Sequence, residues 1–315
     1  SKNTTPFKVN LNGKAINLGV QICEDLWDEG YDLNISDELI KKGAEMIINI
    51  SASPYRKNII DKRLNLCIDK SNHLKYYFIY CNMVGAQDEL VFDGRSFIVN
   101  SNGKVELMCE AFKQDIIDFD TESASSTIND YNTVNQPEEL YRALSLGVKD
   151  YFRKSNFSKA VIGLSGGIDS ALTAAIATEA IGADNVIGVS MPSKFSSQHS
   201  KDDAASLAKN LGIKYESIPI NEIFNNLLSE MGSFFNGTKS GLAEENLQAR
   251  IRGNILMSIA NKINALVLNT GNKTEMALGY CTMYGDMCGA LSVISDLNKI
   301  EVYDISKWLN DSSHS

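Results

Sequence analysis

The sequence lacks the features that mark a membrane protein, a nucleic-acid-binding protein, or a domain stabilised by zinc or disulfides. No stretch approaches the roughly 18 consecutive apolar residues of a membrane span, and the polar start Ser-Lys-Asn-Thr-Thr is not that of a signal peptide. The net charge is -9 without any basic block, which argues against nucleic acid as a partner. The six cysteines contain no Cys-x-x-Cys pair and only three histidines accompany them, which argues against a structural zinc site or a disulfide scaffold. We therefore expect a protein of the reducing cytoplasm without a membrane partner.

What remains is the composition of an ordinary globular protein. The chain has 315 residues, of which 43% are hydrophobic and 22% charged, enough for two domains that each bury a core. The stretch 119–136 is small and polar and has no apolar period, as is typical of a linker. We predict a first domain at 1–120, a linker at 121–136 and a second domain at 137–315.

Strands and helices alternate in both halves. In the first half we expect strands at 17–22, 45–50, 76–81, 92–100 and 105–109, and helices at 36–42 and 58–72. In the second half we expect strands at 160–164, 185–190, 213–218 and 265–269, each followed by a helix. This alternation predicts an α/β fold, with a doubly wound parallel sheet in the second half that binds ligands beyond the carboxyl ends of its strands.

The most informative stretch is Ala-Val-Ile-Gly-Leu-Ser-Gly-Gly-Ile-Asp-Ser at 160–170. A buried strand that turns through two glycines into a helix brings backbone N–H groups and a helix N-terminus around one concavity, which suits a phosphate. Ser165 and Ser170 add hydroxyl donors, and Asp169 could hold Mg²⁺ against the phosphates. A tight turn is the alternative for a bare Gly-Gly pair. The full string 165–170 resembles the pyrophosphate loop of the ATP pyrophosphatases, and it is not a Walker loop because no Gly-Lys-Ser/Thr follows.

A candidate nucleophile, Cys23, follows the apolar run Gly-Val-Gln-Ile and precedes Glu-Asp. The alternative is a small buried hydrophobe, the usual role of a free cysteine. The segments 23–27, 49–54 and 80–97 resemble the nitrilase-type glutaminase domain of the glutamine-dependent NAD synthetases. That resemblance implies that Cys23 forms a thioester with glutamine and releases ammonia. It also implies glutamine contacts for Ser53 and Lys57, which a turn and a surface charge explain as well.

Three segments of the second half resemble the synthetase domain of the same family: 192–200, Glu-Asn-Leu-Gln-Ala-Arg at 245–250, and Asn-Thr-Gly-Asn-Lys-Thr-Glu at 269–275 with Tyr-Gly-Asp at 284–286. The resemblance assigns ATP binding to Gly163, Leu164, Ser165, Gly166, Gly167, Ile168, Asp169, Ser170 and Thr270. It assigns deamido-NAD binding to Asn246, Arg250, Glu275 and Tyr280, and Mg²⁺ binding to Asp169 and Glu275. Lys194 would face the pyrophosphate, with a solvated loop as the alternative. Without the resemblance, Arg250 and Arg252 would be exposed helix charges.

The chain departs from the family pattern at both ends and at two positions. The family's glutaminase base and lysine lie upstream of the cysteine, and Lys2, Lys8 and Lys14 are too close to Cys23 to fill the lysine's place. We therefore expect truncation at both termini and no glutamine hydrolysis by this chain alone. Position 269 is Asn where the family commonly has Gly, which we expect to be a modest backbone change. Position 283 is Met where ammonia-dependent members carry a lysine, which favours the glutamine-dependent branch.

We predict the C-terminal half of a nitrilase-like α/β sandwich, followed by a doubly wound, adenine nucleotide hydrolase-like domain. The resemblance implies that ATP and Mg²⁺ adenylate deamido-NAD, and that ammonia from glutamine then displaces AMP to give NAD. Two alternatives stay open: another ATP-pyrophosphatase amidotransferase, or a nitrilase-like amidase whose second domain binds a nucleotide as a regulator. Apolar surface left by truncation favours a homo-oligomer.

Overall fold

The computed structural model describes residues 4–11, 13–120 and 135–311 and divides into two compact units, Ser1–Gln136 and Pro137–Ser315. The predicted linker at 121–136 lies outside the described residues except for positions 135 and 136. Within the described ranges, no helix is long and apolar enough to cross a membrane.

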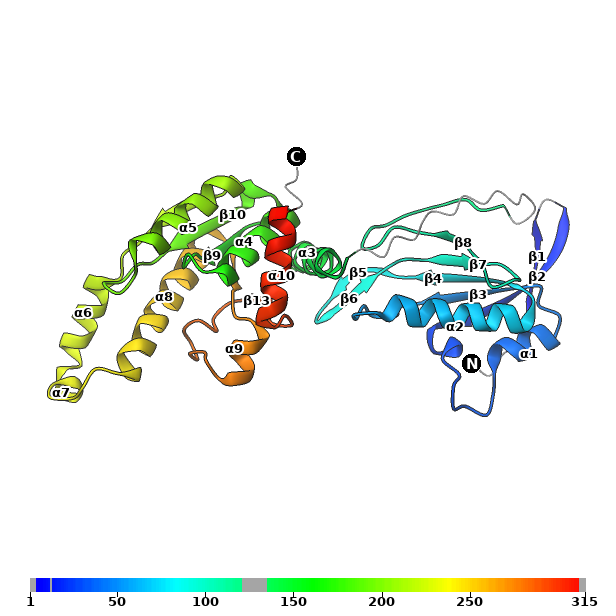
Figure 1. Ribbon diagram of the computed structural model, residues 1–315, viewed down its shortest axis with the longest axis horizontal. Coiled ribbons are helices and arrows are strands. Elements are labelled where there is room, and N and C mark those ends of the chain that lie inside the picture. The colour runs from blue at the N-terminus through cyan, green and yellow to red at the C-terminus, as the bar shows by residue number, and fades with distance from the viewer. Residues whose placement is uncertain (1–3, 12, 121–134, 312–315) are drawn as a thin grey trace. The chain divides into compact units, whose positions relative to one another are not determined.

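The first unit is built on a six-stranded sheet of order β1-β2-β3-β4-β7-β8 (Figure 1). Three neighbouring strands run parallel: β2 (Lys14–Ile22), β3 (Met46–Ser51) and β4 (Tyr77–Asn82). Antiparallel neighbours flank them: β1 (Phe7–Leu11), β7 (Phe97–Val99) and β8 (Val105–Met108). Because the parallel strands end at one edge of the sheet, the residues that follow β2, β3 and β4 lie close together.

Helices α1 (Ile35–Lys41) and α2 (Ile59–Leu74) cover one face of this sheet, and the short 3-10 helix η1 (Cys23–Leu26) lies at the end of β2, before α1. Alternate strand residues such as Ile47, Phe78 and Tyr80 point into the resulting core, as the two-residue period of a strand requires. On the other face, Ile22 and Ile50 are 66% and 54% exposed.

The strand expected at 92–100 is wrong, because two separate strands occupy this stretch. β6 (Leu90–Asp93) pairs with β5 (Val84–Gln87) in a hairpin outside the main sheet, whereas β7 belongs to the main sheet. Gly94 and Arg95, with φ of 65° and 53°, lie between them. This left-handed backbone interrupts an apolar run that otherwise predicts one strand.

The second unit contains the predicted doubly wound parallel sheet, in the order β11-β10-β9-β12-β13. Its strands are β9 (Ala160–Gly163), β10 (Val186–Ser190), β11 (Lys214–Ser217), β12 (Leu266–Asn269) and the short β13 (Leu291–Ser292). The strand order reverses at β9, which has β10 on one side and β12 on the other. In doubly wound sheets, ligands bind at such a reversal, beyond the carboxyl ends of the strands.

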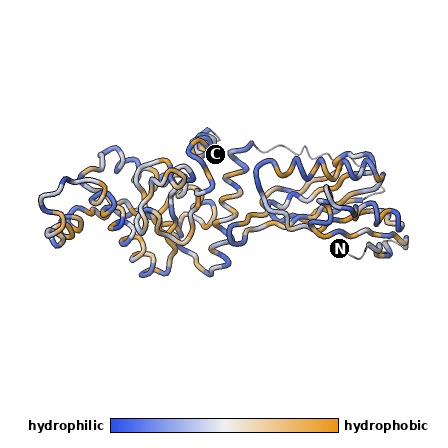
Figure 2. The backbone as a smooth tube through the Cα atoms, turned by 90° about the horizontal axis from the view of Figure 1, so that it is seen from below, coloured by the Kyte–Doolittle hydropathy of each residue, from blue (hydrophilic) through white to orange (hydrophobic). Residues whose placement is uncertain are grey.

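Helices cover both faces of this sheet. One apolar cluster packs α3 (Gln136–Ser155), α4 (Ile168–Ile181), α5 (Gln198–Leu211) and α10 (Lys299–Asp311) against the strands. A second cluster packs α6 (Asn221–Glu230) and α8 (Leu242–Ile263) against the other face. Shorter pieces complete the unit: η2 (Ala183–Asn185), α7 (Gly232–Phe235) and α9 (Lys273–Leu278). The tube in Figure 2 alternates between hydrophobic and hydrophilic along the helices, as helices with one buried face require.

Candidate active sites

The loop at 165–170 connects β9 to α4 and is held by its own hydroxyl groups. The Ser165 hydroxyl accepts a hydrogen bond from Gly167 N at 3.1 Å, and the Ser170 hydroxyl donates to the Gly167 carbonyl at 2.9 Å. Ser165 N donates to the Ser170 oxygen at 3.3 Å. These bonds fix a turn that opens at the N-terminus of α4, where backbone N–H groups favour an anion.

Gly166 brings this loop against the start of α5. Its φ is 82°, and a Cβ added at this position would lie 2.2 Å from the carbonyl oxygen of Ser200. Ser197 caps the same helix by accepting a hydrogen bond from Ser200 N at 3.1 Å. The loop therefore needs a glycine for its backbone conformation and for its close approach to α5.

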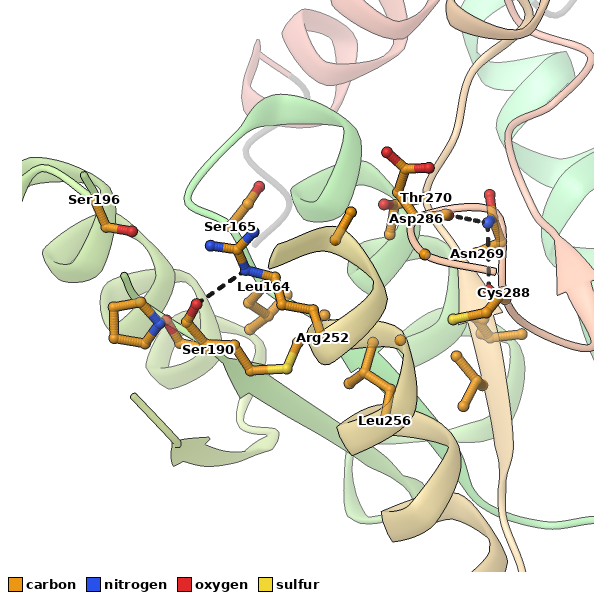
Figure 3. Close-up of a pocket in the computed structure, with 18 of the residues that line it drawn as sticks. Leu164, Ser165, Ser190, Ser196, Arg252, Leu256, Asn269, Thr270, Asp286 and Cys288 are labelled. Carbon is orange, nitrogen blue, oxygen red and sulfur yellow. Dashed lines mark hydrogen bonds between the residues drawn. The ribbon is translucent and has the colours of Figure 1, made fainter. Parts of the chain in front are cut away.

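A cavity of about 370 Å³ lies beyond the carboxyl ends of β9, β10 and β12 (Figure 3). The loop contributes Ser165, the strand ends contribute Ser190 and Thr270, and α8 contributes Arg252 and Leu256. Gly163 and Leu164 of the predicted ATP-binding set also line it. The volume is within the range of small-molecule sites, and the wall combines apolar side chains with hydroxyl, amide and guanidinium groups.

Arg252 is a residue whose position the sequence did not reveal. It is half-buried in the cavity wall, and its Nε donates to the carbonyl of Met191 at 3.1 Å. Burial lowers the pKa of this guanidinium from its usual value. The interpretation as an exposed helix charge is therefore wrong for Arg252. Neither spacing nor charge pattern distinguishes it from Arg250, which is exposed and donates from Nε to the Met283 carbonyl at 3.3 Å.

A smaller cavity of about 180 Å³ adjoins the loop on the side of α4 and α9. It is lined by several of the predicted residues together, namely Ser165, Asp169, Ser170, Thr270, Glu275 and Tyr280. The structure thus places both predicted metal ligands, Asp169 and Glu275, in one wall. Tyr280 is 81% exposed at its rim.

Both carboxylates already have protein partners. Asp169 accepts from Asn272 Nδ2 at 2.9 Å and from the ammonium of Lys299, and Glu275 accepts from Asn272 N at 3.1 Å. No group of three or more His, Cys, Asp or Glu suited to a metal occurs among the described residues. Two carboxylates still fit Mg²⁺, which usually takes one or two protein carboxylates and completes its shell with phosphate and water. Lys299 is a further residue that the sequence motifs missed.

A chain of hydrogen bonds joins the two cavities to Asn246. The buried Asn269 side chain accepts from Gly271 N at 2.7 Å and donates to the carbonyls of Asp286 and Cys288. Asp286 accepts from Thr282 N, and the Thr282 hydroxyl donates to Asn246 Oδ1 at 2.9 Å. The side chain of Asn269 thus makes three hydrogen bonds that no glycine could make, an effect beyond the modest backbone change expected from the sequence.

Other predicted residues of the second unit lie apart from these cavities. The walls of both include neither Asn246 nor Arg250. Lys194 is exposed, with its Nζ 5.0 Å from the Phe195 ring centre, and it lines a separate cavity beside α6 and α8. Gly166, Gly167 and Ile168 form part of the loop and the start of α4 and also line neither cavity.

In the first unit, Cys23 occupies the sharp turn from β2 into η1. Its φ is 44°, and it is neither fully buried nor fully exposed. A positive φ costs a non-glycine residue roughly 1–3 kcal/mol and recurs at functional sites. The buried Asn49 donates from Nδ2 to the Cys23 carbonyl at 3.5 Å, from the end of the adjacent strand β3.

Ser53 follows β3 and is buried in a polar cluster. Its hydroxyl accepts from Arg63 Nε at 3.2 Å, and its N–H donates to Asn82 Oδ1 at 2.9 Å. Arg63 also forms an ion pair of 2.8 Å with Asp93, in which both side chains are 0% exposed. Cys23 and Ser53 thus lie at the ends of neighbouring parallel strands, whereas Lys57 is exposed on the following turn.

Comparisons with known proteins agree with the two-part organisation. The family model of NAD synthase matches residues 140–313, and that of carbon-nitrogen hydrolase matches residues 2–127. The chain is 46% identical over 308 residues to the glutamine-dependent NAD(+) synthetase of Synechocystis sp., covering 94% of this chain and 55% of the relative. The corresponding Thermotoga maritima protein is 43% identical over 94% of this chain and 57% of its own length. The chain therefore spans little more than half the length of these curated relatives.

Solved structures give the same result. The glutamine-dependent NAD+ synthetase of Acinetobacter baumannii, determined in complex with ADP, is 36% identical with a TM-score of 0.88, covering 98% of this chain and 58% of that one. The NMN synthetase of Francisella tularensis is 30% identical with a TM-score of 0.52, covering 55% of this chain and 71% of that one. The resemblance to glutamine-dependent NAD synthetases and the predicted fold class are confirmed.

Proposed function

The chain belongs to the NAD synthase family, and from that premise we propose that it amidates deamido-NAD to NAD at the expense of ATP and ammonia. Release of that ammonia from glutamine at Cys23 would also need the family's upstream glutamate and lysine. The observation that carries the proposal is the arrangement of the loop at 165–170 between two cavities. One cavity is large enough for a nucleoside, and the other contains Asp169 and Glu275. This separates a site for the adenosine from a site for the phosphates.

The first step transfers the adenylyl group of ATP to the nicotinate carboxylate. A carboxylate oxygen attacks the α-phosphorus, and the bond from this phosphorus to the bridging oxygen breaks, so that pyrophosphate leaves with the electron pair. Ser165, Ser170 and the backbone N–H groups at the start of α4 would stabilise the charge on the departing pyrophosphate. Lys299, beside Asp169, would add a positive charge there.

In the second step ammonia attacks the adenylated carboxyl carbon, AMP leaves with the electron pair of the broken C–O bond, and the nitrogen loses a proton to water to give the carboxamide of NAD. Asn246 would contact deamido-NAD through its Nδ2, because its Oδ1 already accepts from Thr282. With that glutamate and lysine in place, the strained turn at Cys23 would present the thiolate that attacks the glutamine amide, so that ammonia leaves and water then hydrolyses the thioester to glutamate. Ser53 would contact the glutamine, which its place beside the end of β2 supports.

Mg²⁺ is part of this proposal. Asp169 and Glu275 would hold it, and it would supply charge neutralisation for the phosphates. We also propose a cytoplasmic, homo-oligomeric enzyme. Free cysteines agree with a reducing compartment, and exposed apolar residues of the smaller cavity, among them Met276 and Met287, suit an interface between copies.

The direct test is pyrophosphate release by this chain in the presence of ATP, Mg²⁺, ammonium and deamido-NAD. We expect release that depends on deamido-NAD and is abolished in Asp169→Ala. Asp202→Ala, which removes an exposed carboxylate of α5, is the matched control and should keep the activity. Retained activity in Asp169→Ala would refute the role of this carboxylate.

The choice of substrate separates the alternatives. The F. tularensis neighbour is an NMN synthetase, so the mononucleotide counterpart of deamido-NAD is the closest competitor, and xanthosine monophosphate represents other amidotransferases. If pyrophosphate release is faster with either of these two compounds than with deamido-NAD, that compound is the substrate. ATP binding without release under any of these conditions would favour a regulatory nucleotide domain.

A further inference from the structure

Arg252 is a half-buried cation in the wall of the larger cavity. Its Nε donates to the Met191 carbonyl, and among the described residues no carboxylate forms an ion pair with it. Lys299 is paired with Asp169, and Arg153 with Asp150. Burial of an unpaired cation is unfavourable, so a guanidinium in this position calls for an anion that the chain itself does not provide.

The acidic groups nearby do not fill that role. Asp286 lines the same cavity but accepts from Thr282 N. Glu244 and Glu245 line the separate cavity beside α6 and α8, whose wall Arg252 also forms. Glu244 is committed to capping α8, where it accepts from Gly241 N at 2.7 Å. The Nη groups of Arg252 are therefore available to a ligand.

The bond to Met191 orients these Nη groups. A guanidinium fixed at Nε by a backbone carbonyl can still present both terminal nitrogens in one plane, the geometry that matches two oxygens of a phosphate. The carbonyl belongs to the segment that follows β10, so the orientation is set by the sheet. Ser165 of the loop lines the same cavity as Arg252.

From this arrangement we propose that Arg252 binds the α-phosphate of ATP, and then of the adenylyl group after transfer. The proposal rests on the proposed function, in which the loop and the cavity of Asp169 take the outer phosphates. Arg252 reaches the nucleotide from the other cavity, where the adenosine lies, so the phosphate next to the ribose is the one it meets. Because the α-phosphate stays with the substrate when pyrophosphate leaves, Arg252 holds the adenylate in both steps.

The test compares ligands that differ only in phosphate. Calorimetric titrations of ATP, AMP and adenosine are made on the wild type, on Arg252→Gln, which removes the charge, and on Arg252→Lys, which keeps it. Lys262→Gln removes an exposed charge from the far end of the same helix and is the matched control. Thermal unfolding of each variant shows whether the cavity wall is intact.

We expect Arg252→Gln to weaken ATP and AMP by the same factor, roughly 10- to 100-fold for a lost charged hydrogen bond, and adenosine by less than about twofold. Arg252→Lys should bind ATP and AMP with intermediate affinity, and Lys262→Gln like the wild type. An equal loss for adenosine, or unchanged ATP and AMP affinities, would overturn the assignment. Failure of the proposed function would be seen in the pyrophosphate assay instead, where the wild type would bind ATP but release no pyrophosphate with deamido-NAD.

Discussion

Gly166 and Ser200 are in such close contact that a methyl group on Gly166 would lie 2.2 Å from the Ser200 carbonyl oxygen. This contact joins two helix starts, since Gly166 precedes α4 and Ser200 lies in the first turn of α5. A backbone atom cannot rotate away as a flexible side chain would. The position of the loop relative to α5 therefore depends on the missing side chain.

Gly166→Ala is expected to displace the loop and to weaken ATP binding at least about tenfold. A shift of even 1 Å moves the hydrogen-bond donors of the loop out of reach of the phosphate oxygens. The control is Gly237→Ala, whose φ of 80° is nearly the same but whose added Cβ would meet nothing within 4 Å. Gly237→Ala should cost about 1 kcal/mol of stability for its backbone conformation and leave ATP affinity unchanged. Calorimetry and thermal unfolding measure both. Equal effects of the two variants on ATP affinity would contradict a steric role.

Features contained in a short stretch of sequence could be predicted, and features that join distant stretches could not. The loop at 165–170 combines strand end, glycines and helix start, so its fold followed from local rules. The pair of Asp169 and Lys299 spans 130 residues, and nothing in either motif refers to the other. Arg252 has the same sequence context as an exposed helix charge, and only the packing of α8 against β9 and β12 turns it into the cavity.

The failures in the first unit have a similar cause. The apolar residues at 92–100 predict one strand, but left-handed residues at Gly94 and Arg95 divide it. Arg63 appears from its spacing as an ordinary helix charge, yet it is fully buried against Asp93. An isolated sequence does not show which charge will find a buried partner, because the partner comes from the folded sheet.

The buried pair of Arg63 and Asp93 should dominate the stability of the first unit. Asp93→Asn leaves the guanidinium without its counter-charge and is expected to cost about 3–5 kcal/mol. The double variant Arg63→Met, Asp93→Leu should lose less than the sum of its single variants. Unfolding in urea is followed by Trp27 fluorescence in a Trp308→Phe background, which leaves one tryptophan, in the first unit.

The exposed pair of Lys41 and Glu38, also in the first unit, provides the comparison. Glu38→Gln should leave the urea midpoint nearly unchanged, because water screens such pairs. If Asp93→Asn unfolds at the same urea concentration as Glu38→Gln, the buried pair does not stabilise the fold in the way proposed.

Cys288 provides a probe of nucleotide binding that does not depend on turnover. It lines the cavity of Arg252, and burial raises the pKa of its thiol. Its labelling by iodoacetamide should rise about tenfold per pH unit below that raised pKa, because only the thiolate reacts. ATP should slow the labelling by covering the thiol. Cys109, in the first unit, also has a pKa raised by burial and should label at the same rate with and without ATP. Mass spectrometry of the labelled peptides reports both sites, and equal protection of the two cysteines would exclude local shielding.

Asn269 should matter for stability and for substrate binding together. Asn269→Ala leaves the half-buried N–H of Gly271 without its acceptor and is expected to cost about 1–3 kcal/mol. Asn269→Asp should cost more, because it keeps the acceptor for Gly271 but sets a carboxylate against the carbonyls of Asp286 and Cys288. Both variants should also weaken deamido-NAD binding, since Asp286 and Thr282 connect Asn269 to Asn246.

The control is Asn254→Ala, at an exposed position of α8, which should change neither stability nor deamido-NAD binding. Trp308 fluorescence in a Trp27→Phe background follows unfolding of the second unit, and calorimetry follows binding. An Asn269→Asp variant as stable as the wild type would show that the hydrogen bonds of the Asn269 side chain do not stabilise the second unit.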